Sequence, residues 1–274
     1  HLEHRRQRQM CIRDRDMTHP DLQGVLWKNP NEIADDGIDN DGNGYVDDIV
    51  GWDFVNEDND PIDDQGHGTR VTGVIAANIG NSTGVAGLLP NPVILPCKVF
   101  GENGKSSDSD VLRALAYLDD LGISIINYSG GEHSYSSSWV ERISELEEAD
   151  VLLTFPAGNE GEDNDISPDY PPSYDHPNII SVGGHHHHGG ISHNYGSVSV
   201  DLFAPARGIQ TTENGGGYAN RGGTSYAAPL VAATAAAIKR IKPDWTAADI
   251  KQAILGSVVK NDIYEGLCVS GGRL

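Results

Sequence analysis

The sequence predicts an α/β fold in which a mainly parallel central sheet is flanked by helices. From Gly66 onward, short apolar segments alternate with amphipathic or alanine-rich segments. Strands of a parallel sheet are buried on both faces and appear as short apolar runs, and their alternation with helices is typical of this class. The 33 glycines among 274 residues agree with many tight turns between short elements.

Four short apolar runs are expected to form buried strands of this sheet. Each is four to seven residues long, a length that fits a strand better than a helix. The runs cover residues 93–99, 123–127, 151–156 and 179–182. Cys97 falls within the first run, and we expect it to be a small core residue.

Five helices are expected between and after these strands. Residues 71–77 are apolar and alanine-rich, and residues 108–121 carry Val111, Leu115 and Leu118 at the spacing of one helix face. The other expected helices cover residues 139–149, 227–241 and 247–255.

Net charge and length limit the classes of function. Forty acidic and nineteen basic residues give a formal net charge of −21, the opposite sign from a typical nucleic-acid-binding domain. Such an excess favours a self-repelling soluble protein or one that holds metal ions with carboxylates. No segment approaches the roughly 20 apolar residues needed to cross a bilayer, so a membrane is not expected as a partner. The negative charge likewise makes nucleic acid an unexpected partner. Three cysteines do not make a disulfide framework.

Three glycine-containing segments carry candidate catalytic side chains. Ser225 follows a glycine-rich turn and opens an alanine-rich helix, so its hydroxyl would lie where the helix dipole favours developing negative charge. His67 stands between two glycines before an apolar helix and could act as a general base. Asn159 follows a buried strand and could point its amide into a site. Taken singly, each residue has a structural alternative: a helix cap, a loop histidine and a turn asparagine.

Together, in this order and spacing, these segments resemble the subtilase family, the subtilisin-like serine endopeptidases. The specific matches are Gly66-His67-Gly68-Thr69, Ala157-Gly158-Asn159 and Gly223-Thr224-Ser225-Tyr226-Ala227-Ala228-Pro229. Weaker likenesses extend the resemblance from Thr18 to the last residue, at 18–22, 84–87 and 269–274.

The resemblance implies a three-layer subtilisin-like fold and a serine endopeptidase mechanism. Ser225 Oγ would attack the scissile carbonyl of a polypeptide, and His67 would move the proton to the leaving amine. Asn159 and the backbone N–H of Ser225 would hold the oxyanion. The resemblance also implies a secreted or extracellular protein that acts as a monomer.

The Asp of the catalytic triad has no counterpart at the expected position. The family carries it seven residues before the histidine of its His-Pro-Asp-Leu segment, and in this chain that position is Ile12. Asp16 matches the second Asp of the family pattern, and Asp14, the nearest substitute, is two residues out of register. Without the Asp, His67 would lose the group that fixes its tautomer. In a subtilisin that loss costs roughly 3 × 10⁴ in kcat.

The segment that would bind the substrate backbone also departs from the family pattern. Ser129, Gly130 and Gly131 resemble the Ser-x-Gly-Gly edge that pairs with substrate as an added strand, with one residue missing or substituted. We expect these three residues to bind substrate, but the departure leaves peptide specificity open.

An acidic insert at residues 35–64 predicts a calcium site. No Lys or Arg occurs between Asn29 and Thr69, a window that contains thirteen acidic residues. Oxygen donors recur at the spacing of the first three-quarters of an EF-hand-like loop, and hard oxygen ligands select Ca²⁺. The expected ligands of a structural Ca²⁺ are Asp39, Asp41, Asn43, Tyr45 (through its carbonyl) and Asp47. A solvated acidic loop is the alternative.

The first fifteen residues do not fit the rest of the chain. They resemble nothing in the family and are too polar for a central strand of a parallel sheet. We interpret residues 1–15 as a segment that is not native to the domain, such as a sequencing junction. Residues 16–274 are then a subtilase peptidase domain, incomplete at both ends.

Other functions remain open. If the natural gene lacks the Asp, the chain is a catalytically silent subtilase-like binding domain. A calcium-dependent adhesion module would rest on the insert alone, and an α/β-hydrolase is disfavoured because Gly223-x-Ser225-x-Ala227 lacks the second Gly of the nucleophile elbow. The four histidines at 185–188 could bind a transition metal, although the glycines around them favour a flexible surface loop.

Overall fold

Nine strands form one large sheet in the part of the chain that the computed structural model describes, residues 9–11, 16–131 and 134–274. Their order is β10-β11-β7-β6-β5-β4-β1-β3-β2, and every neighbouring pair is parallel except β10 and β11. The bounds are β1 Gln9–Cys11, β2 Trp52–Asp53, β3 Ile94–Lys98, β4 Ile125–Asn127, β5 Leu152–Pro156, β6 Ile179–His185, β7 Leu202–Pro205, β10 Val259–Lys260 and β11 Gly272–Arg273. A separate antiparallel hairpin joins β8 (Arg207–Glu213) to β9 (Gly217–Gly222).

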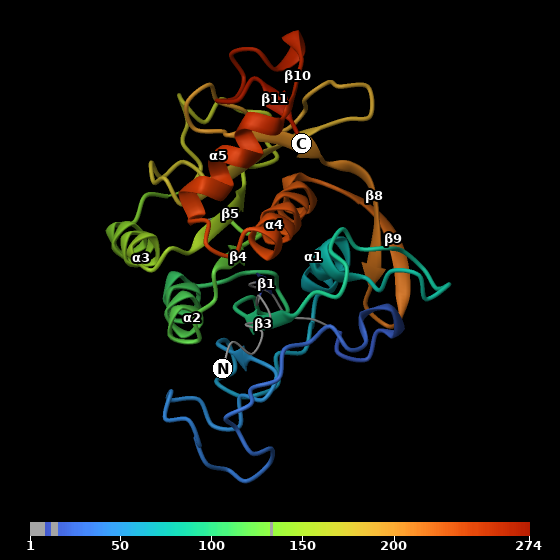
Figure 1. Ribbon diagram of the computed structural model, residues 1–274, viewed down its shortest axis with the longest axis vertical. Helices are drawn as coiled ribbons and strands as arrows, with labels where there is room; N and C mark the ends of the chain where they lie inside the picture. The colour runs from blue at the N-terminus through green and yellow to red at the C-terminus, as the bar shows by residue number, and fades with distance from the viewer. Residues whose placement is uncertain (1–8, 12–15, 132–133) are drawn as a thin grey trace.

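Helices cover both faces of the sheet, which gives three layers (Figure 1). One face carries α1, α4 and α5, and the other carries α2 and α3. Successive residues of a strand point to opposite faces, so Ile125 of β4 joins the first core and Ile126 joins the second. The bounds are α1 His67–Ala76, α2 Asp108–Asp120, α3 Ser137–Glu148, α4 Thr224–Ile241 and α5 Ala247–Ser257, with short 3₁₀ helices η1 Pro20–Leu22 and η2 Asp262–Tyr264.

The predicted α/β fold is confirmed, and all nine helices and strands expected from the sequence are present. The elements that sequence patterns missed are short or polar. The hairpin β8–β9 has mostly half-buried and exposed residues, so it lacks the apolar run that marks a buried strand. Cys97 is fully buried in β3, as expected of a core residue. None of the described helices is long and apolar enough to cross a membrane.

Strand β1 corrects one expectation. Residues 9–11 were expected to be too polar for a central strand, yet their backbone pairs in parallel with β3 on one side and β4 on the other. Two of the three residues, Met10 and Cys11, are of apolar type, and all the charged residues of the segment lie outside the strand. Ladder hydrogen bonds come from the backbone, so three residues suffice to bridge β3 and β4.

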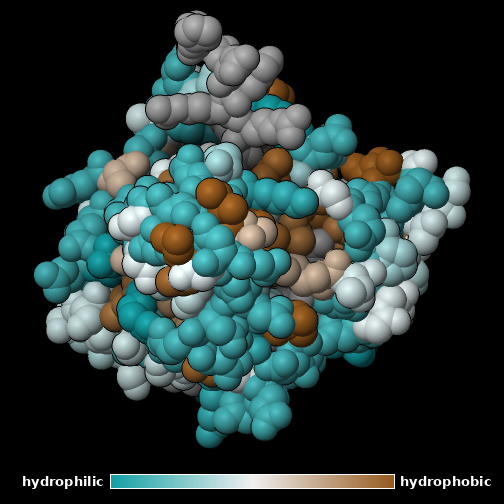
Figure 2. All heavy atoms as spheres, turned by 90° about the horizontal axis from the view of Figure 1, so that it is seen from below, coloured by the Kyte–Doolittle hydropathy of each residue, from teal (hydrophilic) through white to brown (hydrophobic). Residues whose placement is uncertain are grey.

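The long segment before α1 lies at one end of the molecule, outside the three layers (Figure 1). Apart from the two-residue strand β2, residues 29–64 form turns and irregular structure. Viewed from that end, the surface is mostly hydrophilic with scattered hydrophobic spots (Figure 2). Exposed Ile33, Ile38 and Ile62 belong to this segment. Single apolar side chains of this kind are normal on protein surfaces.

Close packing against β8 fixes the position of helix α1. The hydroxyl of Thr212 donates to the carbonyl of Thr69 at 2.7 Å, and the hydroxyl of Thr211 donates to the carbonyl of Arg70 at 2.5 Å. Gly73 makes this approach possible, because a Cβ at this position would lie 2.2 Å from Thr212 Oγ1.

We expect Gly73→Ala to lower the free energy of unfolding by roughly 1–3 kcal/mol, because the added methyl overpacks the contact between α1 and β8. Gly256→Ala is the matched control, since Gly256 lies in α5 with open space around its Cα. In the control, the better helix propensity of Ala should raise the free energy of unfolding by up to about 1 kcal/mol. Urea unfolding of both variants measures the difference, and equal effects would contradict the packing argument.

Candidate active site

The candidate catalytic residues lie at the carboxyl edge of the sheet and at two helix N-termini. Asn159 follows β5, and the segment Ser129–Gly131 follows β4. His67 is the first residue of α1, and Ser225 is the second residue of α4. Carboxyl ends of parallel strands share one edge, which is where α/β proteins bind ligands. The fold therefore gathers residues from four distant parts of the chain.

The N-termini of α1 and α4 lie side by side. The rings of His67 and Tyr226 are 5.5 Å apart between centroids, and Arg70 Nε donates to the Tyr226 hydroxyl at 3.2 Å. Tyr226 directly follows Ser225, so these contacts join the first turn of α1 to the first turn of α4, which carries the candidate nucleophile. Gly66 caps α1 with a positive φ of 88°, a conformation that a side chain would strain.

Hydrogen bonds orient the amide of Asn159. Its Oδ1 accepts from the backbone N–H of Thr224 at 2.9 Å and from the Thr224 hydroxyl at 3.1 Å. The same hydroxyl lies 3.2 Å from the carbonyl oxygen of Gly158. Because Oδ1 is held on the side of Thr224, the Nδ2 donor group faces the other way. An amide held in this manner is suited to stabilise negative charge that develops beside Ser225.

Ser129 ties the candidate substrate segment to the same place. Its hydroxyl donates to the carbonyl of Ser225 at 3.1 Å and accepts from Asn127 Nδ2 at 3.0 Å. Gly130 packs against the ring of Tyr128, where a Cβ would approach to 2.5 Å. The segment therefore runs close to Ser225 at a position that only glycine fits.

Buried charges hold the turn that leads into His67. Asp63 accepts hydrogen bonds from the N–H groups of Gly66 and Thr69. Next to it, Lys98 of β3 is only 2% exposed and bridges Asp53 at 2.9 Å and Asp64 at 2.5 Å. Sequence reasoning missed Lys98, although a lysine inside an apolar strand is itself a signal of a buried ion pair.

The position of the triad Asp lies outside the described residues. Strand β1 ends at Cys11, and both Ile12 and Asp14 follow it in that part of the chain. Asp16 is described, and its carboxylate accepts from the N–H and hydroxyl of Thr18 and from the N–H of Gly215. These partners direct Asp16 toward its own turn and the β8–β9 connection.

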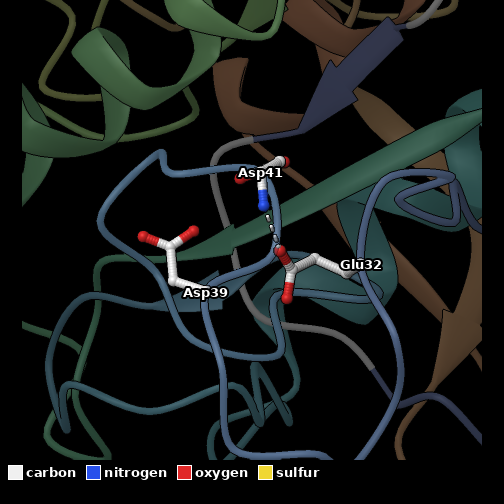
Figure 3. Close-up of side chains that lie close together, drawn as sticks. All are labelled: Glu32, Asp39 and Asp41. Carbon is white, nitrogen blue, oxygen red and sulfur yellow. Dashed lines mark hydrogen bonds between the residues drawn. The ribbon is translucent and has the colours of Figure 1, made fainter.

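Three carboxylates converge in the acidic insert. Glu32, Asp39 and Asp41 each offer an oxygen within 4.8 Å of the others, and the Asp41 N–H donates to Glu32 Oε1 at 3.0 Å (Figure 3). Hydrogen bonds from backbone N–H groups, that of Gly44 foremost, lower the pKa of the Asp39 carboxyl. This cluster is the only one of its kind found among the described residues.

The observed cluster differs in part from the predicted ligand set. Asp47 turns its carboxylate toward the N–H groups of Asp36 and Gly37, away from the other two aspartates. Asn43 donates to Asp48 at 3.0 Å. The Tyr45 ring packs among aromatic side chains, which leaves the prediction for its carbonyl untested. The third carboxylate of the cluster belongs to Glu32. The loop pattern missed this residue because Glu32 precedes the insert.

Comparisons with known proteins give a consistent picture. The model of the Subtilase family matches residues 9–268. Subtilisin-like protease 1 of Plasmodium berghei (strain Anka) is 31% identical over 290 residues, which cover 97% of this chain and 48% of that protein. Thermophilic serine proteinase of Bacillus sp. (strain AK1) is 34% identical over 223 residues, covering 81% of this chain and 49% of that protein. The chain thus spans about half the length of these curated relatives.

A solved structure supports the fold. The crystal structure of a cold adapted subtilisin-like serine proteinase superposes with a TM-score of 0.76 at 23% sequence identity. The match covers 95% of this chain and 84% of that chain. The three-layer subtilisin-like fold expected from the sequence is therefore confirmed.

We expect Lys98→Met to lower the free energy of unfolding by about 3 kcal/mol, because it leaves the buried Asp53 carboxylate without its counter-ion. Adding Asp53→Asn to that variant should recover part of the loss, since neither member of the former Lys98–Asp53 pair then carries a charge. Urea unfolding of the single and double variants measures both effects. A double variant no more stable than Lys98→Met would show that the cost comes from packing instead.

Proposed function

The chain belongs to the subtilase family, and we propose that it is a serine endopeptidase that hydrolyses peptide bonds of polypeptide substrates. The observation that carries the proposal is the double hydrogen bond from Thr224 to Asn159 Oδ1, which directs the amide donor of Asn159 away from Thr224. A turn asparagine with only a structural role would not need its amide held next to a serine at a helix N-terminus. A proteolytic site requires such a donor beside its nucleophile.

In the proposed mechanism each of the candidate residues has a defined role. Ser225 Oγ attacks the scissile carbonyl while His67 accepts its proton, and His67 then donates that proton to the leaving amine. Asn159 Nδ2 and the N–H of Ser225 hold the oxyanion of the tetrahedral intermediate. Ser129, Gly130 and Gly131 bind the substrate backbone as an added strand. A water then releases the acyl group by the reverse sequence.

The site has no Asp at the position from which the family orients the catalytic histidine. The residue that directly follows β1 is Ile12, which cannot accept a hydrogen bond from an imidazole. This residue also favours a second candidate function, a catalytically silent subtilase-like domain that binds polypeptides without cleaving them. The two functions share one binding site and differ only at the residue that follows β1.

We propose that the acidic insert binds a structural Ca²⁺. The donor chemistry fits, because Glu32, Asp39 and Asp41 present hard oxygen atoms within 4.8 Å of one another. Bound calcium would neutralise mutually repelling carboxylates. Glu32 Oε2 also accepts from the Asp47 N–H at 3.1 Å, so the same carboxylate ties the loop together.

We further propose a secreted protein that works as a monomer. Calcium at millimolar concentration is available outside cells, which suits a site of one buried and two half-buried carboxylates. The formal charge of −21 keeps copies of the chain apart.

We expect the chain as written to be nearly inactive toward casein and Ile12→Asp to raise kcat by roughly 10⁴, the scale set by loss of the triad Asp in a subtilisin. Adding Ser225→Ala to Ile12→Asp should abolish the gain. Robust casein hydrolysis by the unaltered chain, lost on Ser225→Ala, would refute the assignment of position 12. No activity in either form would favour the silent binding domain.

We expect EDTA to lower the melting temperature by about 5 °C at low salt, because calcium binds only the folded form. Glu32→Gln should abolish most of this EDTA effect while it keeps an acceptor for the backbone N–H groups. Glu265→Gln removes an exposed carboxylate far from the insert in sequence and should leave the effect intact. A melting temperature insensitive to EDTA would rule out structural calcium.

A further inference from the structure

A cavity of about 430 Å³ lies beside the ends of β6 and β7, where the proposed mechanism uses no residue. Residues 185–188, Arg207 and Arg273 line it together with Asn261, and no Asp or Glu is among the described residues of its lining. The chain as a whole is strongly negative, with forty acidic residues. The described lining of this cavity has the opposite sign, because it contains two arginines and no carboxylate.

Two of the residues that line the cavity, Arg207 and Arg273, are cationic. Neither Arg207 nor Arg273 belongs to any ion pair found among the described residues. Other arginines of the molecule, such as Arg70 and Arg221, pair with Glu213. Guanidinium groups bind carboxylates in a bidentate manner, so a cavity with two of them is suited to an anionic ligand.

His185 lines the cavity with a largely buried imidazole. The residue ends β6 and is only 6% exposed, in contrast to the flexible surface loop expected from the sequence. Burial lowers the pKa of its imidazole, and Nδ1 lies 2.9 Å from the carbonyl oxygen of His186. Nδ1 therefore carries the proton, and Nε2 is a buried acceptor with no hydrogen-bond partner among the described residues.

This combination fits a peptide better than a bare anion or a metal ion. A peptide brings a carboxylate for the arginines on a chain large enough to fill the rest of the cavity. A metal ion would meet the positive charge of two guanidinium groups, and no group of three histidines close enough to share an ion was found among the described residues. The volume also exceeds what a single small anion needs.

The order of strands places this cavity beyond Asn159, on the side away from Ser129–Gly131. Ser129–Gly131 follows β4, Asn159 follows β5, and the cavity lies at the ends of β6 and β7. The N–H of Gly223 donates to the carbonyl of Ala206 at 2.8 Å, so Arg207 lies close to the segment that leads into Ser225. A chain that pairs with Ser129–Gly131 and passes Ser225 continues toward the cavity.

We propose that the cavity binds an acidic side chain of the polypeptide substrate, on the opposite side of the scissile bond from the part held by Ser129–Gly131. This inference rests on the proposed function, because it needs a polypeptide that crosses Ser225. It makes Arg207 a specificity residue for glutamate or aspartate in that part of the substrate.

Peptide binding to the Ser225→Ala chain tests the proposal without cleavage. Fluorescein-labelled peptides that carry a Glu pair at successive positions are compared by anisotropy with peptides that carry Gln instead. At the favoured position we expect Glu to bind about tenfold tighter than Gln, the scale of a hydrogen-bonded charge pair. Arg207→Gln should abolish this preference. Lys242→Gln, which removes the same charge at the far end of α4, should preserve it.

Each other outcome overturns the proposal. Equal binding of Glu and Gln peptides, or a preference that survives Arg207→Gln in a chain with unchanged thermal melting, removes the acidic subsite. Displacement of the peptide by inorganic phosphate far beyond the effect of chloride at equal ionic strength makes the cavity a small-anion site. Labelling of Ser225 by a fluorophosphonate in the Ile12→Asp variant reports on the proposed function independently. If Ser225 is not labelled but the Glu peptides still bind more tightly than the Gln peptides, the endopeptidase function is rejected and the acidic subsite is retained.

Discussion

Burial of the sheet on both faces is the constraint from which the rest of the structure follows. Strands β3 to β6 each contribute one residue to the core under α4 and a neighbouring residue to the core under α2, as Leu152 and Leu153 do in β5. Neither face is left for a binding site, so polar chemistry can occur only at the strand ends. Because the strands are parallel, their carboxyl ends meet at one edge, and Asn159 and Ser129 lie there.

Two helix N-termini complete this edge, and polar contacts fix their positions. The hydroxyls of Thr211 and Thr212 seat α1 on the β8–β9 hairpin, while Thr224 links α4 to Asn159. The buried ammonium of Lys98 joins β3 to the turn before His67. Each contact connects an element of the core to a helix, strand end or turn that carries or leads into a residue of the site. The geometry of the site is therefore coupled to the stability of the fold.

The sequence predicted the elements whose patterns are strong and local. Alanine-rich and apolar runs predicted α1 to α5 and the buried strands. Glycine-flanked motifs indicated His67, Asn159 and Ser225 as candidate catalytic residues. The sequence could not show that Glu32 lies beside Asp39 and Asp41, because the way a loop folds back determines which carboxylates converge. Loop spacing alone favoured Asp47 instead. It misjudged residues 9–11, because backbone pairing with β3 and β4 outweighs the polarity of the flanking residues. The cavity arginines lie in β11 and at the start of β8, and only the fold brings them together.

The charge of −21 is distributed unevenly, and this distribution matters for a substrate. The acidic insert lies at one end of the molecule, whereas β10 and β11 beside the cavity lie at the other (Figure 1). A chain of this length has a radius of gyration of about 19 Å, so the two ends are separated by several Debye lengths at physiological ionic strength. The insert therefore cannot cancel the local attraction of Arg207 and Arg273 for a carboxylate. An acidic polypeptide meets repulsion over most of the surface and attraction at the cavity, which favours the orientation in which its acidic residue lies beyond Ser225.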